Sequence, residues 1–310
     1  MKILFTGTSS FIAYWTIKEL KEAGHEVTGI LRRNPKDYEG IKKERVKLVS
    51  ELCKIVPGVS FGDDKFLDLI KSSSWDVLCH HAAQATNPRS PDFDWLGALK
   101  GNTSNIEKVL EEFKNCGGKH LIITGSLYEA NEPAGSKPLD AFNKYGLSKT
   151  LTWEVFRYFC RAHDIKLGKL ILPIVFGMYE DPKFVSYLVK SWLKNETPVV
   201  KTPKYIRDNI NVTLAAKTYK WYLETFVSAE SPAKFRPSGY VGSQGDFAKL
   251  VARELGPRLK IECPLEFFDQ VEFPEPKIKK NTHILDHKAL GWNESHAWDE
   301  LAEYYLKIYK

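Results

Sequence analysis

The first 31 residues carry a strand, a tight turn, a helix and a second strand, and this order constrains the fold more than any other feature of the sequence. Residues 2–6 are a short apolar run, Gly7 opens a turn, and apolar side chains recur at helical spacing over residues 11–23. Gly24 stands where a glycine commonly ends a helix, and residues 27–31 form a second apolar run. Such a βαβ unit predicts parallel strands joined by crossover helices, so we expect an α/β protein.

The turn of this unit lies where a bound dinucleotide places its diphosphate, against the amide groups at the start of the helix. The usual turn has three glycines, but here Gly7 alone remains, and Ser10 and Ala13 occupy the later positions. The small side chains still permit close approach, although Ser10 narrows the pocket. On the turn alone, a dinucleotide site and an ordinary βα turn are equally good interpretations. The candidate contacts are Gly7, Thr8, Ser9, Ser10, Phe11 and Ile12.

The end of the second strand bears on the type of cofactor. An acidic residue at this point would bind the ribose hydroxyls of NAD. The sequence instead has Arg32 and Arg33, and planar guanidinium groups suit the 2′-phosphate of NADP. Two solvated arginines after a strand are the alternative. We therefore expect NADP, with NAD as the second possibility.

Strands and helices continue to alternate along the chain, as a doubly wound sheet requires. We place the third strand at residues 59–61 in preference to 46–49, which puts Asp63 near the adenine amino group. Further strands are expected at 75–79, 121–123 and 167–172, and helices at 66–70, 95–113 and 143–163. The later part of the chain is expected to form helices at 182–193, 212–226, 246–255 and 297–309.

Two adjacent histidines, His80 and His81, follow the fourth strand. Neighbouring residues of a strand point to opposite faces of the sheet, so we do not expect them to share a metal ion and predict no metal site. Ala82 and Ala83 come next, and their small side chains suit a loop pressed against a cofactor.

A tyrosine and a lysine near the start of a long helix are the candidate catalytic pair. The helix is expected to begin within Phe142-Asn143-Lys144-Tyr145. Tyr145 and Lys149 are four residues apart and so share one helix face. A nearby ammonium lowers the pKa of a phenol from about 10 towards the range useful for proton transfer. Tyr-x-x-x-Lys also occurs by chance in many helices. The catalytic interpretation of the pair therefore depends on residues upstream of it.

Those upstream residues are Thr124 and Ser126, two hydroxyls at the carboxyl end of a predicted strand. Open α/β sheets bind their ligands at that end of the strands. We therefore expect the two hydroxyls and the Tyr145 pair to surround one site.

Composition excludes several other classes of protein. The net charge is +6, but acidic and basic residues are mixed and form no long basic block, so no nucleic-acid partner is expected. The five cysteines are scattered and form no Cys-x-x-Cys pair, which indicates reduced thiols in a cytoplasmic protein. No apolar run approaches the roughly 20 residues of a membrane span, and no signal peptide is visible. A small-molecule ligand fits these observations best.

Taken in chain order, the motifs resemble those of the extended short-chain dehydrogenase/reductases, in particular the nucleotide-sugar epimerase, dehydratase and reductase group. The matching pieces are Thr6-Gly7-x-x-Ser10-x-x-Ala13, Gly62-Asp63, His80 to Ala83, Asn102, Thr124-Gly125-Ser126, Tyr145-x-x-x-Lys149, Pro173 to Gly177, Tyr205 to Val212 and Leu290-Gly291-Trp292. The resemblance implies a Rossmann-type doubly wound parallel sheet with a smaller C-terminal substrate-binding cap. The dinucleotide-binding domain would span residues 1–173 and the cap 174–310, with 206–242 returning to the first domain.

The resemblance also implies roles for single residues. Tyr145 would be the general acid and base, Lys149 would hold the nicotinamide ribose, and Thr124 or Ser126 would bind the reacting oxygen. The distance along the chain to Tyr128 favours Thr124, whereas the Thr-Gly-Ser sequence keeps Ser126 as a competitor. The implied cofactor contacts are the turn residues named above with Arg32, Arg33, Asp63, His81, Ala82, Ala83, Asn102, Tyr145, Lys149 and Pro173.

On the substrate side, Arg207 would contact a diphosphate, with Lys201 and Ser126 in the same site. The resemblance further implies a homodimer formed through the helices at 95–113 and 145–163. The two arginines after the second strand favour an NADP(H)-dependent reductase of a nucleotide-linked 4-keto-deoxy sugar. The alternative is a nucleotide-sugar 4-epimerase, or a dehydratase, that keeps NAD tightly bound. A non-catalytic dinucleotide-binding sensor is the further alternative.

Overall fold

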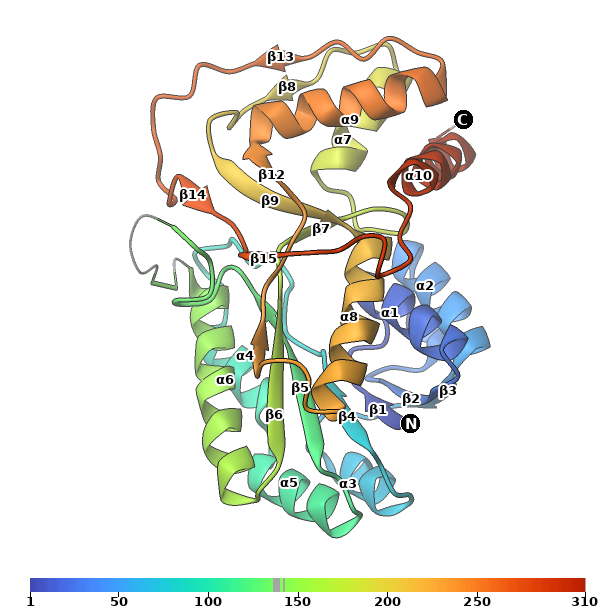
Figure 1. Ribbon diagram of the computed structural model, residues 1–310, viewed down its shortest axis with the longest axis vertical. Helices are drawn as coiled ribbons and strands as arrows, with labels where there is room; N and C mark the ends of the chain where they lie inside the picture. The colour runs from blue at the N-terminus through green and yellow to red at the C-terminus, as the bar shows by residue number, and fades with distance from the viewer. Residues whose placement is uncertain (136–139, 142, 310) are drawn as a thin grey trace.

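The computed structural model describes residues 1–135, 140–141 and 143–309. Figure 1 shows a large parallel sheet with helices on both faces and a smaller α/β body beyond one end of its strands. This arrangement confirms the expected α/β class and the doubly wound sheet.

The large sheet has seven parallel strands in the order β10-β6-β5-β4-β1-β2-β3. Their bounds are β1 (Lys2–Phe5), β2 (Glu26–Leu31), β3 (Lys54–Pro57), β4 (Val77–His80), β5 (His120–Ser126), β6 (Lys166–Leu172) and β10 (Lys234–Phe235). The chain builds outward in one direction from β1 and then in the other from β4. The carboxyl ends of β1 and β4 therefore flank a topological switch point, where open α/β sheets form a ligand crevice.

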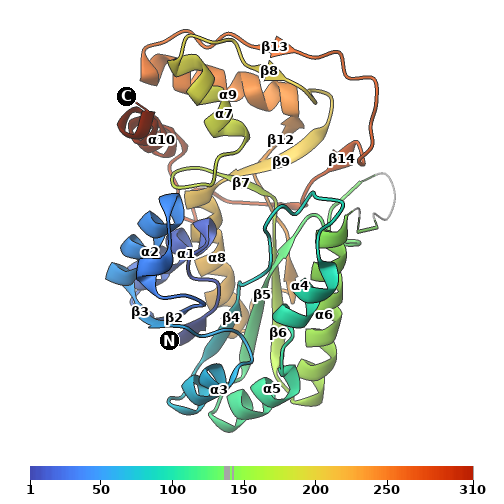
Figure 2. The ribbon, with the colours of Figure 1, turned by 180° about the vertical axis from the view of Figure 1, so that it is seen from behind.

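Each face of the sheet has its own apolar core, because side chains alternate along the strands. Ile3 and Phe5 of β1 pack with α1 (Phe11–Glu22), α2 (Gly40–Leu52) and α8 (Val212–Val227). Leu4 packs in the opposite core. That core is covered by α3 (Asp64–Lys71), α5 (Ile106–Asn115) and α6 (Lys144–Ala162), with α4 (Trp95–Asn102) lying along α6. Figure 2 shows α4, α5 and α6 together on this face.

The third strand lies elsewhere than expected. β3 is Lys54–Pro57, so the prediction of a strand at residues 59–61 is wrong. Gly58, with a φ of +69°, ends β3 and turns the chain before that apolar run. The other candidate, residues 46–49, belongs to α2, where Val46 and Val49 form the buried side of the helix.

The single helix expected at residues 95–113 is divided into α4 and α5. Asn105 separates them with a φ of +47°, and its side-chain amide donates to the carbonyl of Gly62 over 2.7 Å. A side chain at Gly62 would bring its Cβ to within 1.9 Å of the Ser104 carbonyl oxygen. The break between α4 and α5 thus lets the chain pass close to the turn before α3. The apolar periodicity continues across the break, so the sequence pattern does not reveal it.

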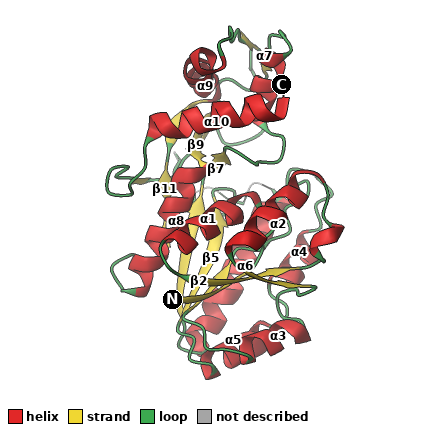
Figure 3. Ribbon diagram, turned by 90° about the vertical axis from the view of Figure 1, so that its right-hand side faces the viewer, coloured by secondary structure: helices red, strands yellow, loops and turns green. Residues whose placement is uncertain are grey.

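The smaller body is built on a four-stranded sheet of β7 (Ile174–Phe176), β9 (Ile206–Asn211), β12 (Tyr240–Ser243) and β14 (Ile278–Lys279). The helices α7 (Phe184–Leu193), α9 (Gln244–Leu259) and α10 (Glu294–Tyr309) cover it, as Figure 3 shows. Short strands pair as β8 (Val199–Val200) with β13 (Glu266–Phe267) and as β11 (Pro237–Ser238) with β15 (His283–Ile284), and a 3₁₀ turn spans Pro35–Asp37. Within the range 206–242, α8 and β10 lie with the large sheet, whereas β9 and β12 lie in the small one.

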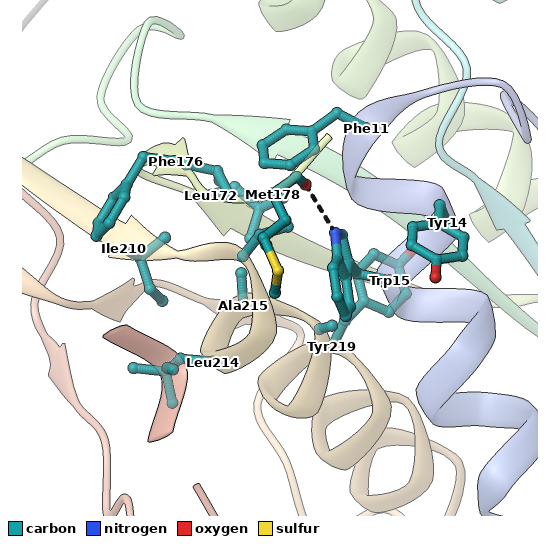
Figure 4. Close-up of a cluster of buried hydrophobic side chains, with 14 of the residues drawn as sticks. Phe11, Tyr14, Trp15, Leu172, Phe176, Met178, Ile210, Leu214, Ala215 and Tyr219 are labelled. Carbon is teal, nitrogen blue, oxygen red and sulfur yellow. Dashed lines mark hydrogen bonds between the residues drawn. The ribbon is translucent and has the colours of Figure 1, made fainter. Parts of the chain in front are cut away.

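One apolar cluster joins the two bodies (Figure 4). Trp15 of α1 donates its indole N–H to the carbonyl of Met178, which follows β7, over 3.1 Å. The labelled side chains come from α1, β6, β7, β9 and α8: Phe11, Tyr14, Trp15, Leu172, Phe176, Met178, Ile210, Leu214, Ala215 and Tyr219. The crevice at the switch point therefore rests on a continuous core.

Candidate active site

Local capping and close packing place Tyr145 at the carboxyl end of β5. The side chain of Asn143 caps α6 by accepting from the amide of Gly146 over 2.7 Å, and Phe142 lies outside the described residues. A Cβ at Gly146 would come within 2.0 Å of the Tyr128 carbonyl oxygen. The first turn of α6 is thus pressed against the turn that follows β5, and Tyr145 is held beside that turn.

The environment of Tyr145 raises its pKa. Burial is the main cause, the charges of Glu129 and Tyr128 add to it, and a hydrogen bond with the Ser126 side chain opposes it. The expectation that Lys149 lowers this pKa is wrong for the structure. The Lys149 ammonium instead donates to the Thr124 carbonyl over 2.6 Å. Burial also lowers the pKa of Lys149, although the Glu129 carboxylate opposes that shift.

The two candidate hydroxyls of β5 differ in their partners. Ser126 is half-buried and is the side chain that hydrogen-bonds with Tyr145. Thr124 is buried, and its hydroxyl lies 2.9 Å from His81 Nδ1 and donates to the Tyr219 hydroxyl over 3.2 Å. Only Ser126 is therefore next to the phenol that would transfer a proton.

A buried ion network lies behind Ser126. Lys169 of β6 donates to the carboxylates of Glu129 and Glu132, and all three side chains are about 1% exposed. Lys234 and Arg236 each contact Glu132 over 2.8 Å. Glu129 also accepts from the amide of Ser126 over 2.8 Å. The network fixes the segment after β5 and so fixes the position of Ser126.

The turn after β1 keeps the shape that a dinucleotide diphosphate requires. Gly7 has a φ of +76°, and a Cβ there would lie 2.8 Å from backbone atoms of Ala82. The turn is thus pressed onto the loop after β4. Among the described residues, no acceptor faces the amides of Phe11 and Ile12, whereas the Ser10 hydroxyl accepts from the amide of Ala13 over 3.0 Å. Two amides at the start of α1 are therefore available to a diphosphate, so the turn fits this group.

The adenosine end of the crevice is less specific. Arg32 and Arg33, expected from the sequence to bind a 2′-phosphate, are exposed directly after β2. Asp63 caps α3, and its carboxylate accepts from the amides of Phe66 and Ser60 over 2.8 and 2.7 Å. Asn102 is buried and donates to Thr152 over 3.2 Å. The side chains of Asp63 and Asn102 thus each hydrogen-bond with neighbouring parts of the protein and stabilise the local structure.

His80 and His81 lie on opposite faces of the sheet, as expected. His80 stacks on Phe156 in one core, and His81 packs between Phe5 and Tyr219 in the other. Ala82 and Ala83 follow them at the crevice, and Pro173 is buried between β6 and β7. Within the described ranges, no group of three or more His, Cys, Asp or Glu side chains is arranged to hold a metal ion.

The two residues expected to bind substrate from the cap differ in their surroundings. Arg207 is buried, stacks 4.1 Å from the ring centre of Tyr205, and donates to Glu275 over 3.0 Å and to three backbone carbonyls. Lys201 is exposed directly after β8, a strand that lies at the outer end of the cap in Figure 1.

Two further cations lie close to the site and were missed in the sequence. Arg89 donates to the Tyr128 hydroxyl over 3.0 Å, and Lys279 lies 5.1 Å from the centre of the same ring. Burial lowers the pKa of Lys279 to about 7, and the charges of Arg207 and Arg89 add to this shift. The Tyr128 ring is in turn 6.3 Å from that of Tyr145. No spacing rule links these residues along the chain, since they meet only through the fold.

Comparison with known proteins agrees with this geometry. Residues 3–236, more than half of the chain, match the NAD dependent epimerase/dehydratase family. The fold is similar to that of UDP-glucuronic acid 4-epimerase from Bacillus cereus, solved with UDP-glucuronic acid and NAD, with 18% identity, a TM-score of 0.74 and 100% of both chains covered. It is also similar to UDP-glucose 4-epimerase from Thermotoga maritima, solved with UDP-glucose, with 18% identity, a TM-score of 0.70 and 100% of both chains covered.

The enzyme of the same name from Thermus thermophilus, solved with NAD, gives 16% identity and a TM-score of 0.72 over 99% of this chain and 100% of that one. No helix among the described residues is long and apolar enough to cross a membrane. The expected resemblance is confirmed: the chain belongs to the NAD dependent epimerase/dehydratase family, within the extended short-chain dehydrogenase/reductases.

Proposed function

We propose that this protein is a nucleotide-sugar epimerase that inverts a sugar carbon by reversible hydride transfer. The observation that carries the proposal is the placement of Ser126, Tyr145 and Lys149 at the carboxyl end of β5, beside a turn that fits a diphosphate. The matched family is named for epimerases and dehydratases, and the similar solved structures are UDP-sugar 4-epimerases. NAD, when bound, would accept the hydride and return it.

The residues of the chain account for the proton and the orientation. Tyr145 exchanges a proton with the sugar oxygen, and Ser126 hydrogen-bonds with that oxygen and with the phenol. Lys149 is held by the Thr124 carbonyl one helical turn from Tyr145, where it can bind the nicotinamide ribose. The amides of Phe11 and Ile12 would hold the diphosphate of the dinucleotide.

The charge near Tyr128 supports an anionic substrate. Arg89, Arg207 and Lys279 lie around one carboxylate, Glu275, so the set carries an excess of positive charge. A nucleotide sugar brings a negatively charged diphosphate to such a set. Because the similar structures hold UDP-glucose and UDP-glucuronic acid, UDP-sugars are the first substrates to test.

A second candidate, an NADPH-dependent reductase of a nucleotide-linked keto sugar, rests on two observations. Arg32 and Arg33 stand where NAD-binding chains carry an acidic residue. The raised pKa of Tyr145 keeps its phenol protonated near neutral pH, which suits proton donation to a carbonyl oxygen.

One experiment separates the candidates. The small molecules released from denatured protein are identified by mass spectrometry, and the protein is then incubated with UDP-glucose and UDP-glucuronic acid while products are followed by NMR. Stoichiometric NAD with inversion at one sugar carbon and no net change in cofactor supports the epimerase. Loosely held NADP(H), with net NADPH consumption on a keto sugar, supports the reductase.

The matched control is Tyr145→Phe, which removes one oxygen and leaves the ring. We expect it to retain the dinucleotide and to lose turnover by about 10²-fold or more, in line with the loss of a general acid. Full turnover in this variant, or a wild-type protein that neither contains nor binds a dinucleotide, would overturn the proposed function.

A further inference from the structure

A continuous line of hydrogen bonds runs from the turn after β1 to Tyr219 of α8. It runs from Ser10 to His81 Nε2 over 2.7 Å, and from His81 Nδ1 to Thr124 over 2.9 Å. Thr124 continues it to the hydroxyl of Tyr219 over 3.2 Å. The line thus joins the diphosphate turn to the strand that carries the catalytic hydroxyls.

The direction of the protons in this line follows from Thr124. Its single hydroxyl proton is donated to Tyr219. Thr124 must therefore accept from His81, so the neutral ring carries its proton on Nδ1. His81 Nε2 is then an acceptor, and the Ser10 hydroxyl donates to it. Burial and the charge of Lys149 hold the pKa of His81 at about 3, so the ring stays neutral.

This arrangement occupies two donors that an anion could otherwise use, the amide of Ala13 and the hydroxyl of Ser10. Its oxygen accepts from the amide of Ala13, the third residue of α1, and occupies the place of an incoming anion oxygen. Its proton is donated to His81. Of the first three amides of α1, those of Phe11 and Ile12 remain available in the described part of the chain.

We propose that Ser10 and His81 form a latch that sets the affinity of the site for the dinucleotide diphosphate, holding it below the level that the bare turn would give. The latch rests on the proposed function, since it presupposes that a dinucleotide binds here. It makes Ser10 and His81 positioning residues for the cofactor. It also commits Thr124 to His81, which leaves Ser126 for the reacting oxygen.

The test uses Ser10→Gly, His81→Leu and the double variant of the full chain, titrated with NADH and NADPH by nicotinamide fluorescence, with release rates measured in excess ADP-ribose. Ser10→Gly frees the Ala13 amide, and His81→Leu frees the Ser10 proton. A hydrogen bond to a charged group is worth enough that we expect each single variant to bind about tenfold more tightly and to release the dinucleotide more slowly. The double variant should gain no more than either single one, since the pair acts as a unit.

Ser243→Gly is the matched control, because Ser243 caps α9 as Ser10 caps α1, accepting from the amide of Asp246 over 2.9 Å, and it leaves the Ser10–His81 contact in place. We expect its dinucleotide affinity to stay within about twofold of wild type, a change of less than about 0.5 kcal/mol. Thermal unfolding of every variant shows whether the fold is retained.

The outcomes separate the latch from the proposed function. Unchanged or weaker binding by Ser10→Gly, or a gain in the double variant equal to the sum of the single gains, overturns the latch and leaves the proposed function standing. A purely steric role of Ser10 would leave His81→Leu like wild type, which also overturns the latch. If neither wild type nor any variant binds a dinucleotide, both the latch and the proposed function are wrong.

Discussion

At the scale of single residues, the main question is whether the hydroxyl of Thr124 or that of Ser126 faces the phenol of Tyr145. Thr124 and Ser126 are two residues apart on β5 and so point to the same face of the sheet. Their partners distinguish them, because Thr124 is bound by His81 and Tyr219, whereas Ser126 is bound to Tyr145. The spacing to Tyr128 favoured Thr124 in the sequence. Spacing alone cannot show that the imidazole ring of His81 already hydrogen-bonds with the Thr124 hydroxyl.

We expect Ser126→Ala to lower kcat by about 10²-fold, the usual loss when a donor to a developing oxyanion is removed. Thr124→Val should keep most of kcat at saturating dinucleotide, yet lose about 1–3 kcal/mol of stability because a buried His81 N–H is left without its acceptor. Steady-state kinetics and chemical denaturation measure the two effects. The reverse order of the two kcat values would return the catalytic role to Thr124.

His80 gives a pH-dependent stability of defined sign. It is 1% exposed, and burial lowers its pKa to about 3. The unfolded chain takes up a proton on this ring below about pH 6.5, while the folded chain does not. His80 therefore leaves stability intact above about pH 6.5 and costs about 1.4 kcal/mol per pH unit as the pH falls from there towards 3.

His80→Gln should remove this dependence and so flatten the curve of unfolding free energy against pH by about that slope between about pH 5.5 and 4. Urea denaturation at several pH values is the measurement. Parallel curves for the two proteins would show that His80 does not stay neutral when folded.

At the scale of elements, the start of α6 decides where the proton donor stands. Gly146 has no room for a side chain, because a Cβ would meet the backbone oxygen of Tyr128 at 2.0 Å. Backbone cannot move aside as the end of a flexible side chain can. The residue after Tyr145 therefore controls the distance between α6 and the end of β5.

Gly146→Ala should push α6 away from this turn and lower kcat by at least about tenfold, since a displacement near ~1 Å is costly in a catalytic pair. Gly101→Ala is the control, because Gly101 lies in the exposed part of α4 with open space at its Cβ position. That change should add up to about 1 kcal/mol of stability through helix propensity alone. Equal activity in the two variants would show that the contact at Tyr128 is not restrictive.

The sequence predicts helices and strands well where residues close together in the chain determine their bounds. The Gly24 helix end, the Asn143 cap and the buried runs of β1, β2, β4, β5 and β6 all follow from local patterns, and the family resemblance is confirmed. β3 was missed because it is a short, half-buried edge strand, whose single apolar pair Ile55-Val56 is no stronger than the run at 59–61. The break at Asn105 depends on Gly62, 43 residues away, and no local pattern contains that contact.

The site was predictable as a set of residues, but the hydrogen bonds within it were not. The stretch around Tyr145 and Lys149, the hydroxyls of β5 and the Gly7 turn do come together. The pairing of Ser10 with His81 and the use of the Arg207 guanidinium by the loop at Glu275 arise from tertiary contacts. The raised pKa of Tyr145 has the same origin, because burial in the fold is its main cause.

At the scale of the whole molecule, the buried ion network joins segments that are far apart in the chain. Lys169 from β6 meets Glu129 and Glu132 from the segment after β5, and Lys234 and Arg236 reach Glu132 from β10 and the residue after it. The network thus ties the outer strands of the large sheet to the segment that positions Ser126.

Lys169→Met should cost about 3–5 kcal/mol, since it leaves buried carboxylates with less compensating charge. Lys18→Met is the control: the Lys18–Glu22 pair is solvent-exposed at 39% and 55%, and its loss should change stability by less than about 0.5 kcal/mol. Equilibrium unfolding measures the free energy of unfolding of both variants and of the wild type. A Lys169 variant as stable as the control would mean that the two glutamates are protonated or rearranged in the fold.

The order of the strands also has a consequence for the chain during its synthesis. β10 completes the outer edge of the large sheet beside β6, but it is made only after the chain has passed through β7, α7, β8, β9 and α8. Until then the backbone groups of β6 on that side lack their partner strand, and an open edge can pair with another nascent chain. The buried part of the network at that stage holds one lysine and two glutamates, a net charge of −1 beside the open edge. Negative charge beside an open edge disfavours pairing with an identical edge, so we expect the carboxylates that later bind Lys234 and Arg236 to oppose such pairing until β10 is made.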